Sequence, residues 1–503
     1  MWINSKHFRK LANAEQAAYR SPIPTQMVSN GEYMPLAQTS AQAEVEHRIK
    51  EIADANGKRL GLSRRQFLET GSGMAAAFMA MNQVFGHIFA VGAAEAAEPA
   101  AANERRAALA NEFIFDAQTH HVRDTFDREG LLGLRRWAQG RNTKGIVINP
   151  DLPTDDPTLD VFNLDHYIKD IFLDSDTDVA ILSGFTSETP EHMALTTDEI
   201  IESRKLINQL TGSQRLMGHG LFWPGKPGNL EEMDRIAKDL KIDSWKGYTV
   251  GDPGEGESQY PWMMDDEKVA FPCWELAEKT GIRNICIHKG LIPPDYEKFT
   301  NWKYAAADDI AGAAKAFPNL NFIIYHAALR PAMDLDATEA EFEKTGYIPW
   351  VSDLADIPKK HGVTNVYAEI GSTFGSSVVT HPRLAAGIMA QLVKGFGHDH
   401  VIYGTDSVWY GSPQWQIEAL RRMEIPEDLQ EKHDWAPLGP VTGKVKRAIF
   451  GMNAAKVYGV EVEAKRNPMP ANYKDKLALL KADYQAQGAK PSHAYYGWIQ
   501  RSA

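Results

Sequence analysis

The feature that most constrains the fold of this chain is a regular alternation of short apolar runs with longer helix-like stretches from residue 113 onward. Eight runs are predicted to be strands, because they are short and dense in Ile, Val and Phe. They are FIFDAQ, DVAILSG, RLMGHGLF, DSWKGYTV, NICIHKG, NFIIYHA, NVYAEIG and HVIYGTD. Strands that alternate with helices form βαβ units and a parallel sheet. Eight units predict an α/β fold of the (β/α)8 TIM-barrel type, with a doubly wound open sheet as its competitor.

Five of the eight runs finish in a residue that can bind a ligand or move a proton. In a barrel of this type the carboxyl ends of the strands converge on one mouth, where active sites lie. The residues concerned are Gln118 and His120 on the first run, His288 on the fifth, His326 on the sixth, Glu369 on the seventh and Asp406 on the eighth. One such residue is common at any strand end, but an ordered set predicts a site.

The segment before the barrel contains a paired arginine, Arg64 and Arg65, followed by a weakly apolar run rich in Ala, Gly and Met. With the Ala94-Glu95-Ala96 stretch as a cleavage site, it resembles a twin-arginine export signal. This resemblance predicts an exported, periplasmic protein that uses the twin-arginine machinery. No stable membrane span is expected, because polar residues interrupt the run. The alternative is an amphipathic or buried helix with a chance arginine pair.

The domain organisation follows from these signals. Residues 1–96 are predicted to be an N-terminal extension with the signal region, and 97–112 a linker or short helix. Residues 113–460 form the predicted barrel, and 461–503 a C-terminal helical tail that packs on the barrel or on another subunit, as in a homodimer. The excursion of residues 121–178 and the stretches 251–266 and 292–302 are predicted to be insertions at the mouth.

Composition excludes several classes of protein. The net charge is −12 and no dense Lys/Arg stripe occurs, so nucleic acid is not an expected partner. Only two cysteines are present, which excludes a disulfide framework and a cysteine-rich metal cluster. A small-molecule substrate is the expected partner.

The strand-end motifs resemble those of the amidohydrolase superfamily, in its amidohydrolase-related branch, which includes aminocarboxymuconate-semialdehyde decarboxylase. The markers are DAQTHHV on the first run, ICIHKG on the fifth, IIYHAA on the sixth and VIYGTDS on the eighth. A closing IFGMNAAKVYGV resembles the terminal helix of the family, with its Gly-x-Asn-Ala segment.

The resemblance implies a role for each matched residue. His120 and His288 would be ligands of one divalent metal ion, and Asp406 would bind the same ion and handle the protons of the attacking water. His326 would polarise the substrate or stabilise developing negative charge.

The chain departs from the family at Gln118, where the first strand normally offers a second histidine. An amide oxygen is a poorer ligand than imidazole for Zn²⁺. Three interpretations stay open. The site binds one ion, zinc by ligand type, with Gln118 as a weak ligand or substrate contact; it binds a harder ion such as Mn²⁺ or Mg²⁺; or it has lost the metal, as in metal-independent lactonases.

These roles predict a metal-dependent hydrolase that acts on a small carboxylated or cyclic ester, lactone or amide. The alternatives are a non-oxidative decarboxylase on the same site, a metal-free lactonase, and a silent barrel that binds a small molecule or a partner.

Five further residues are candidate substrate contacts. Arg330 is suited to clamp a carboxylate, or else forms a surface salt bridge. Lys246 is predicted to be a substrate contact or an ion pair inside the barrel, with Glu369 as its partner. Lys289 is placed to meet an anionic substrate, and Trp409 to line a pocket for a flat one or to pack the loop.

Overall fold

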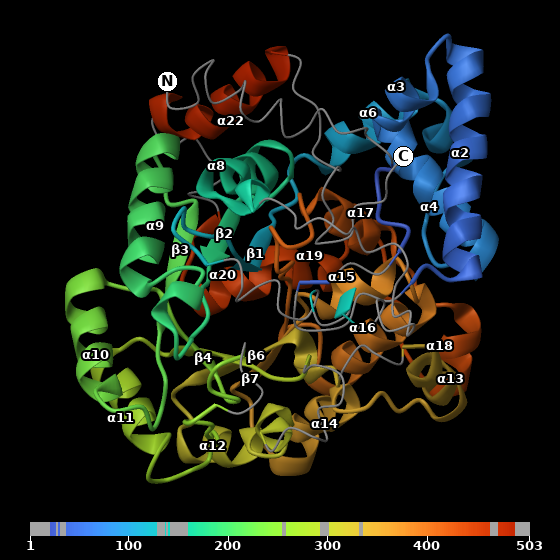
Figure 1. Ribbon diagram of the computed structural model, residues 1–503. Helices are drawn as coiled ribbons and strands as arrows, with labels where there is room; N and C mark the ends of the chain where they lie inside the picture. Colours follow the sequence, from blue (N-terminus) through green and yellow to red (C-terminus); the bar gives the residue numbers. More distant parts are fainter. Residues whose placement is uncertain are drawn as a thin grey trace.

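An eight-stranded parallel sheet forms the centre of the molecule (Figure 1). The computed structural model describes residues 21–26, 29–30, 37–127, 136, 139–140, 159–253, 258–291, 301–330, 335–462 and 471–487. The strands are β1 (Phe115–Thr119), β2 (Val179–Leu182), β3 (Leu216–Leu221), β4 (Ser244–Tyr248), β5 (Asn284–His288), β6 (Asn321–Tyr325), β7 (Val366–Glu369) and β8 (Val401–Ile402). Their order in the sheet is their order in the chain, and each corresponds to one of the eight predicted runs.

The last strand returns to the first and closes the sheet. The N–H of Ala117 donates to the carbonyl of Tyr403 at 3.0 Å, and the N–H of Asp406 donates to the carbonyl of Gln118 at 2.9 Å. A parallel bridge between Thr119 and Ser407 continues this pairing beyond the end of β8. The predicted (β/α)8 barrel is therefore confirmed, and the open-sheet alternative is not what the chain forms.

Apolar side chains fill the barrel. Phe115, Ile181, Met217, Ile323 and Ile402 belong to a cluster of their own, distinct from the larger core between strands and helices. The strands are buried along almost their whole length, which explains their near-continuous apolar sequences. A packed interior leaves the mouth as the place for a site.

Helices surround the sheet. They include α9 (Thr197–Thr211), α10 (Asn229–Arg235), α11 (Phe271–Thr280), α12 (Ile310–Ala316), α14 (Val351–His361), α16 (Pro382–Phe396) and α17 (Gln414–Arg422). α9 starts with a capping box between Thr196 and Glu199. α11 ends at Gly281, whose φ of 76° lies in the left-handed region that glycine favours.

Residues 40–109 form a group of helices against one side of the barrel, coloured blue in Figure 1. They are α2 (Ser40–Leu60), α3 (Arg64–Leu68), α4 (Gly71–Phe85), α5 (Ala93–Ala97) and α6 (Pro99–Leu109). α4 is the Ala/Gly/Met-rich run of the predicted signal, and it is largely buried because it packs on both α2 and α17. Within the described part of the chain, no helix is both long and apolar enough to cross a membrane.

The paired arginines of the predicted export signal lie at the surface. Arg64 pairs with Asp54 at 2.5 Å and Arg65 with Glu69 at 3.1 Å, and each arginine side chain is close to half exposed, at 47% and 46%. The buried-helix alternative therefore describes where α4 lies, whereas the export signal itself stays a prediction.

The predicted mouth insertions fall partly outside the described residues, which omit 128–135, 137–138, 141–158, 254–257 and 292–300. From residue 159 the chain forms η1 (Asp160–Phe162), α8 (Leu164–Tyr167) and η2 (Ile168–Leu173). Tyr167 shares a hydrogen bond of 2.8 Å with Thr119 at the end of β1. In the C-terminal tail, α22 (Ala471–Ala486) lies against α9 and η2, and Lys481 donates to the carbonyl of Ser175.

Candidate active site

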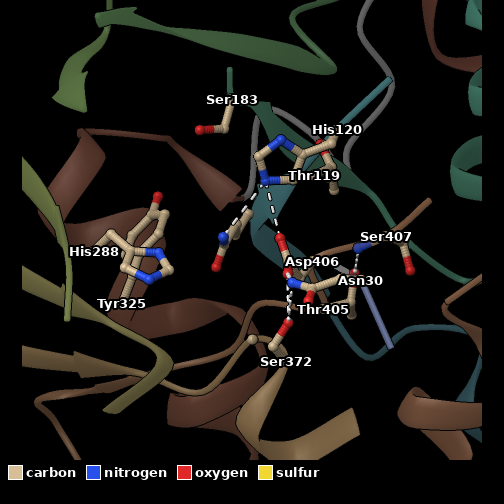
Figure 2. Close-up of polar contacts among 12 residues, drawn as sticks. Asn30, Thr119, His120, Ser183, His288, Tyr325, Ser372, Thr405, Asp406 and Ser407 are labelled. Atoms are coloured by element: carbon tan, nitrogen blue, oxygen red, sulfur yellow. Dashed lines mark hydrogen bonds and ion pairs between the residues drawn. The ribbon is translucent and has the colours of Figure 1, made fainter. Parts of the chain in front are cut away.

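The ends of five strands carry the predicted site residues to one end of the barrel. They are Gln118 and His120 from β1, His288 from β5, His326 from β6, Glu369 from β7 and Asp406 from β8. None of the six is more than 3% exposed. Figure 2 shows His120 and Asp406 on one side of the site, with His288 and Tyr325 together on the other. The six residues form two groups, one on β1 and β8 and the other on β5, β6 and β7.

The first group is the pair of His120 and Asp406. His120 Nε2 lies 2.9 Å from Asp406 Oδ1, and the Ser372 hydroxyl donates to Asp406 Oδ2. Burial alone would raise the pKa of Asp406, but the hydrogen bonds from His120 and Ser372 outweigh it and hold that pKa below its ordinary value. Asp406 is therefore ionised at neutral pH. Since a carboxylate only accepts, His120 Nε2 carries the proton of their hydrogen bond.

Two buried polar atoms beside this pair have no hydrogen-bond partner within the described structure, namely His120 Nδ1 and Gln118 Oε1. As placed, Gln118 Nε2 lies 3.5 Å from His120 Nε2, which sets two donors against each other. Exchanging the positions of the Gln118 amide oxygen and nitrogen places Oε1 where it accepts the proton on His120 Nε2. The Gln118 NH₂ group then takes the unpartnered position and is available as a donor. The site then offers a ring-nitrogen lone pair and an amide donor to a bound molecule.

The second group links two imidazoles to a backbone carbonyl. His326 Nδ1 lies 2.8 Å from the carbonyl oxygen of Gly371, and His326 Nε2 lies 3.0 Å from His288 Nδ1. The carbonyl can only accept, so the neutral His326 carries its proton on Nδ1, and His288 Nδ1 donates to His326 Nε2. Burial lowers the pKa of His326 to about 4 and also lowers that of His288. Both rings are thus neutral at pH 7.

Glu369 lies beneath this second group and is held by the backbone. It accepts hydrogen bonds from the N–H of Gly371 at 2.5 Å and from the N–H of His326 at 3.2 Å. Burial raises the pKa of Glu369 to about 8. A side chain at Gly404 would collide with its carboxyl group, which explains why glycine precedes Thr-Asp at the end of β8.

Three residues of the site have backbone conformations that are rare outside glycine. The φ angles are 63° at His326, 55° at Ser372 and 59° at Asp406. Each such conformation costs on the order of 1–3 kcal/mol and persists only where surrounding contacts hold it. Their concentration after β6, β7 and β8 supports a functional role for this end of the barrel.

Besides Glu369, two of the five predicted substrate contacts lie at the site. Trp409 packs with its ring centroid 5.5 Å from that of His120 and is only 4% exposed. Lys246 is buried inside the barrel, with Nζ 3.8 Å from the centroid of the Tyr325 ring. Its charge lowers the pKa of Glu369 against the larger effect of burial, whereas an ion pair between the two side chains stays a prediction.

The other two lie in different surroundings. Lys289 donates to both carboxylate oxygens of Asp309 at 2.8 Å, so it is engaged in a buried ion pair. Arg330 stacks over Trp350, with 6.0 Å from the guanidinium carbon to the ring centroid. The residues that follow it, 331–334, are outside the described structure. The substrate roles of Lys289 and Arg330 stay predictions.

Two residues of the site, Ser372 and Asn30, were not found by sequence reasoning. Ser372 binds Asp406, and its hydroxyl lies 2.7 Å from that of Tyr410, an aromatic residue that the sequence suggested only as a pocket lining. Ser372 lies just beyond β7, so a wider search of the strand ends would have included it. Asn30 Nδ2 donates to Asp406 Oδ2 at 2.9 Å. No sequence signal marked Asn30, because it lies in the segment that was set apart from the barrel.

The donor set does not fit the metal ion that the resemblance implies. Within the described residues, no group of three or more His, Cys, Asp or Glu side chains is placed to hold an ion. The nitrogen and oxygen atoms are instead turned toward each other, His120 to Asp406 and His288 to His326. The amide at Gln118 takes the place of a stronger imidazole ligand. The metal therefore stays a prediction for measurement.

Comparison with known proteins agrees with the sequence motifs. Residues 218–460 match the family model described as amidohydrolase, which supports the amidohydrolase superfamily. The match spans β3 to β8 and so includes His288, His326 and Asp406, whereas Gln118 and His120 precede it. No curated relative matches the chain.

Several solved structures resemble this chain at low identity. An uncharacterized TIM-barrel protein from Bordetella bronchiseptica is 14% identical, covering 69% of this chain and 98% of that one, with a TM-score of 0.43. The 5-carboxyvanillate decarboxylase from Sphingomonas paucimobilis is 14% identical, covering 70% and 100%, with a TM-score of 0.42. The 4-oxalomesaconate hydratase from Rhodopseudomonas palustris is 15% identical, covering 73% and 100%, with a TM-score of 0.40. Identities of this size carry no activity from one chain to another.

Proposed function

We propose that this chain is a hydrolase of the amidohydrolase superfamily that opens a small carboxylated or cyclic ester, lactone or amide without a metal ion. The observation that carries the proposal is the buried hydrogen bond between His120 and the ionised Asp406. A carboxylate that holds one ring nitrogen of an imidazole prepares the other nitrogen to accept a proton. In this chain that other nitrogen, His120 Nδ1, has no partner within the described structure.

In the first step a water molecule attacks the substrate carbonyl. One O–H bond of the water breaks, its proton passes to His120 Nδ1, and a new C–O bond forms at the carbonyl carbon. The imidazolium is stabilised by Asp406, whose charge is fixed 2.9 Å from the opposite nitrogen. The Gln118 NH₂ group is the donor available to the developing oxyanion.

In the second step the bond from the carbonyl carbon to the leaving group breaks. The proton on His120 passes to the leaving oxygen or nitrogen, which returns His120 to its neutral form. His288 remains neutral throughout, with its Nδ1 held by His326, and it lies across the site from His120. His326 acts through His288 by fixing which of its nitrogens carries the proton.

The side chains around His120 favour a flat substrate. The ring of Trp409 packs near that of His120, and Phe162 lies edge-on to Trp409 with 5.3 Å between ring centroids. Aromatic walls of this kind bind planar or cyclic molecules by burying their faces.

The test is a panel of lactones, esters and amides, with and without a carboxyl group, assayed after exhaustive chelation. We expect turnover that survives chelation and falls about 10³-fold in Asp406→Asn, which keeps the shape but removes the charge. Asp309→Asn is the matched control, because Asp309 is an equally buried carboxylate that pairs with Lys289 away from His120. Release of CO₂ without hydrolysis would contradict this proposal and favour the alternative, a non-oxidative decarboxylase on the same site. Loss of all turnover on chelation, restored by a divalent ion, would contradict the metal-free mechanism.

A further inference from the structure

We propose that Asn30, from the N-terminal segment, is a positioning residue of the active site that holds the Asp406 carboxylate toward His120. The inference rests on the proposed function, since it assigns Asp406 a task in the reaction. It adds a part of the chain that lies outside the barrel and 376 positions from its partner in the sequence.

Asn30 completes the hydrogen bonding of one carboxylate oxygen. Its Nδ2 group lies 2.9 Å from Asp406 Oδ2 and 3.2 Å from the Ser372 hydroxyl oxygen. Ser372 donates its own proton to the same Oδ2, so the Ser372 oxygen is left to accept from Asn30 and from Tyr410. Figure 2 shows Asn30, Ser372 and His120 arranged around Asp406.

The arrangement divides the two oxygens of Asp406 between two tasks. Oδ2 receives the fixed donors of Asn30 and Ser372, and Oδ1 is left for His120. A carboxylate held at one oxygen cannot rotate freely, so the other oxygen keeps its direction toward the imidazole. Asn30 is 6% exposed and the preceding Ser29 is fully buried, so the contact is enclosed.

The N-terminal segment is tied to the helices that follow it. The side chain of Gln38 donates to the carbonyl of Thr25 at 2.9 Å and to Glu46 of α2 at 2.9 Å. The Thr25 hydroxyl also donates to Glu46, at 3.2 Å. These contacts fix Thr25, five residues before Asn30, to α2.

Those helices are in turn fixed to the barrel by buried charges. Arg422 of α17 donates to both carboxylate oxygens of Glu95, at 2.5 and 3.0 Å, and to Glu418 at 2.9 Å. The backbone N–H of Ala90 donates to the carbonyl of Arg422 at 2.8 Å. A bidentate pair of this kind has a defined geometry, and breaking it would leave the buried Arg422 with Glu418 as its remaining carboxylate.

The proposal conflicts with cleavage at the predicted Ala94-Glu95-Ala96 site. Removal of residues 1–96 would delete Asn30 and Glu95 together, and with them both the contact to Asp406 and the bidentate partner of Arg422. Export of the folded chain with its N-terminal region retained is compatible with the proposal. The active chain should therefore contain Asn30.

The first experiment compares kcat and KM of the full chain with those of Asn30→Ala and Asn30→Asp. Asn30→Asp keeps the size of the side chain but sets a carboxylate against Asp406. Gln26→Ala is the matched control, since Gln26 is a buried amide of the same segment at 7% exposure. We expect kcat to fall about 10- to 100-fold in Asn30→Ala and further in Asn30→Asp, with KM changed less than about threefold and Gln26→Ala close to wild type.

A wild-type kcat in Asn30→Asp, or an equal loss in all three variants, would overturn the positioning role. So would higher activity in the Asn30 variants, because that result would make the segment an inhibitor of the site. An intact mass showing that the active chain begins after residue 30 would overturn it as well.

The second experiment separates this proposal from the proposed function. Urea unfolding midpoints are measured for Asn30→Ala, Asp406→Asn and the double variant. If the two residues are in contact, the two shifts are not additive, whatever the enzyme turns over. Additive shifts would overturn the contact. Non-additive shifts in a chain that hydrolyses nothing on the panel would retain the role of Asn30 at Asp406 and reject the hydrolase.

Discussion

The mouth of the barrel contains His120 on one side and the linked pair of His288 and His326 on the other, and the two sides differ in the group to which the imidazole is hydrogen-bonded. His120 rests against an ionised carboxylate at 2.9 Å, whereas His326 rests against a neutral carbonyl at 2.8 Å and passes its hydrogen bond to His288. All three rings are buried to a similar degree. The difference in partner therefore decides their chemistry, because burial opposes charge on a ring unless a counter-charge adjoins it.

This comparison assigns the two sides of the site different work. The side of β1 and β8 carries a fixed negative charge and can take up a proton. The side of β5, β6 and β7 is neutral, with its imidazole pKa values lowered by burial and its carboxyl pKa raised to about 8 at Glu369. In the proposed mechanism, proton transfer belongs to the first side and orientation of the substrate to the second.

The largest expected effect comes from removing the imidazole that bears the proton. His120→Ala should lower kcat about 10³-fold, because general base catalysis contributes about 10²–10⁴-fold. His326→Ala should lower kcat only about 10- to 100-fold, since it acts through His288. Steady-state kinetics on one substrate of the panel measures both, with circular dichroism to check folding. Equal losses, or a larger loss in His326→Ala, would break the division between the two sides.

The second prediction concerns Glu369 and stability. The folded-state pKa of about 8 lies above the ordinary value of 4.5, so the folded chain keeps a proton that the unfolded chain releases between these pH values. The stability from this proton is fully present below pH 4.5 and is lost as the pH rises through 8. At 1.36 kcal/mol per pH unit, the total loss is on the order of 4 kcal/mol.

Glu369→Gln cannot titrate and should flatten this dependence. The window from pH 7 to pH 9 is the informative one, because burial also raises the pKa of Asp116, to about 7, and that group is already half ionised at pH 7 and titrates little above pH 8. Urea unfolding at pH 7, 8 and 9 should show a smaller fall in the free energy of unfolding for the variant than for the wild type. The absolute stability of the variant is not diagnostic. In glutamine one of the two oxygens that accept from the backbone N–H groups of Gly371 and His326 becomes an NH₂ group, which cannot accept. Parallel curves would show that Glu369 is already ionised and that this side of the site is charged.

The barrel was predictable from the sequence because its signals are local. Each strand is a dense apolar run, and a helix such as α11 stops at a glycine in the left-handed region. The convergence of His288, His326 and Asp406 followed from one rule of topology, that parallel strands end at the same face. Nothing in that reasoning needed the side-chain contacts themselves.

What escaped prediction depends on contacts between distant parts of the chain. Asn30 meets Asp406 across 376 positions, and one asparagine carries no periodic signal. The run that became α4 has the composition of a signal's apolar region and of a buried helix alike, since small apolar residues suit both. Ligand types at His120 and His288 suggested a metal ion, but the direction of each ring nitrogen depends on hydrogen bonds that the sequence does not display.

The smallest expected effect on turnover concerns metal content, and it is the most direct test of whether the two sides of the site are separate. A metal ion would join the two sides, because it would bind His120 and Asp406 together with His288. We expect the full chain, purified without chelator, to carry less than about 0.1 ion per chain, since its donors are paired with each other.

Gln118→His restores the second imidazole of the first strand and should raise that occupancy, because imidazole binds divalent ions more strongly than an amide does. Elemental analysis of the two proteins, with Gln42→His as a control amide buried in α2, measures this directly. About one ion in the wild type, lost in His120→Ala, would mean that the two sides act as one metal centre and that their hydrogen bonds describe only its ion-free form.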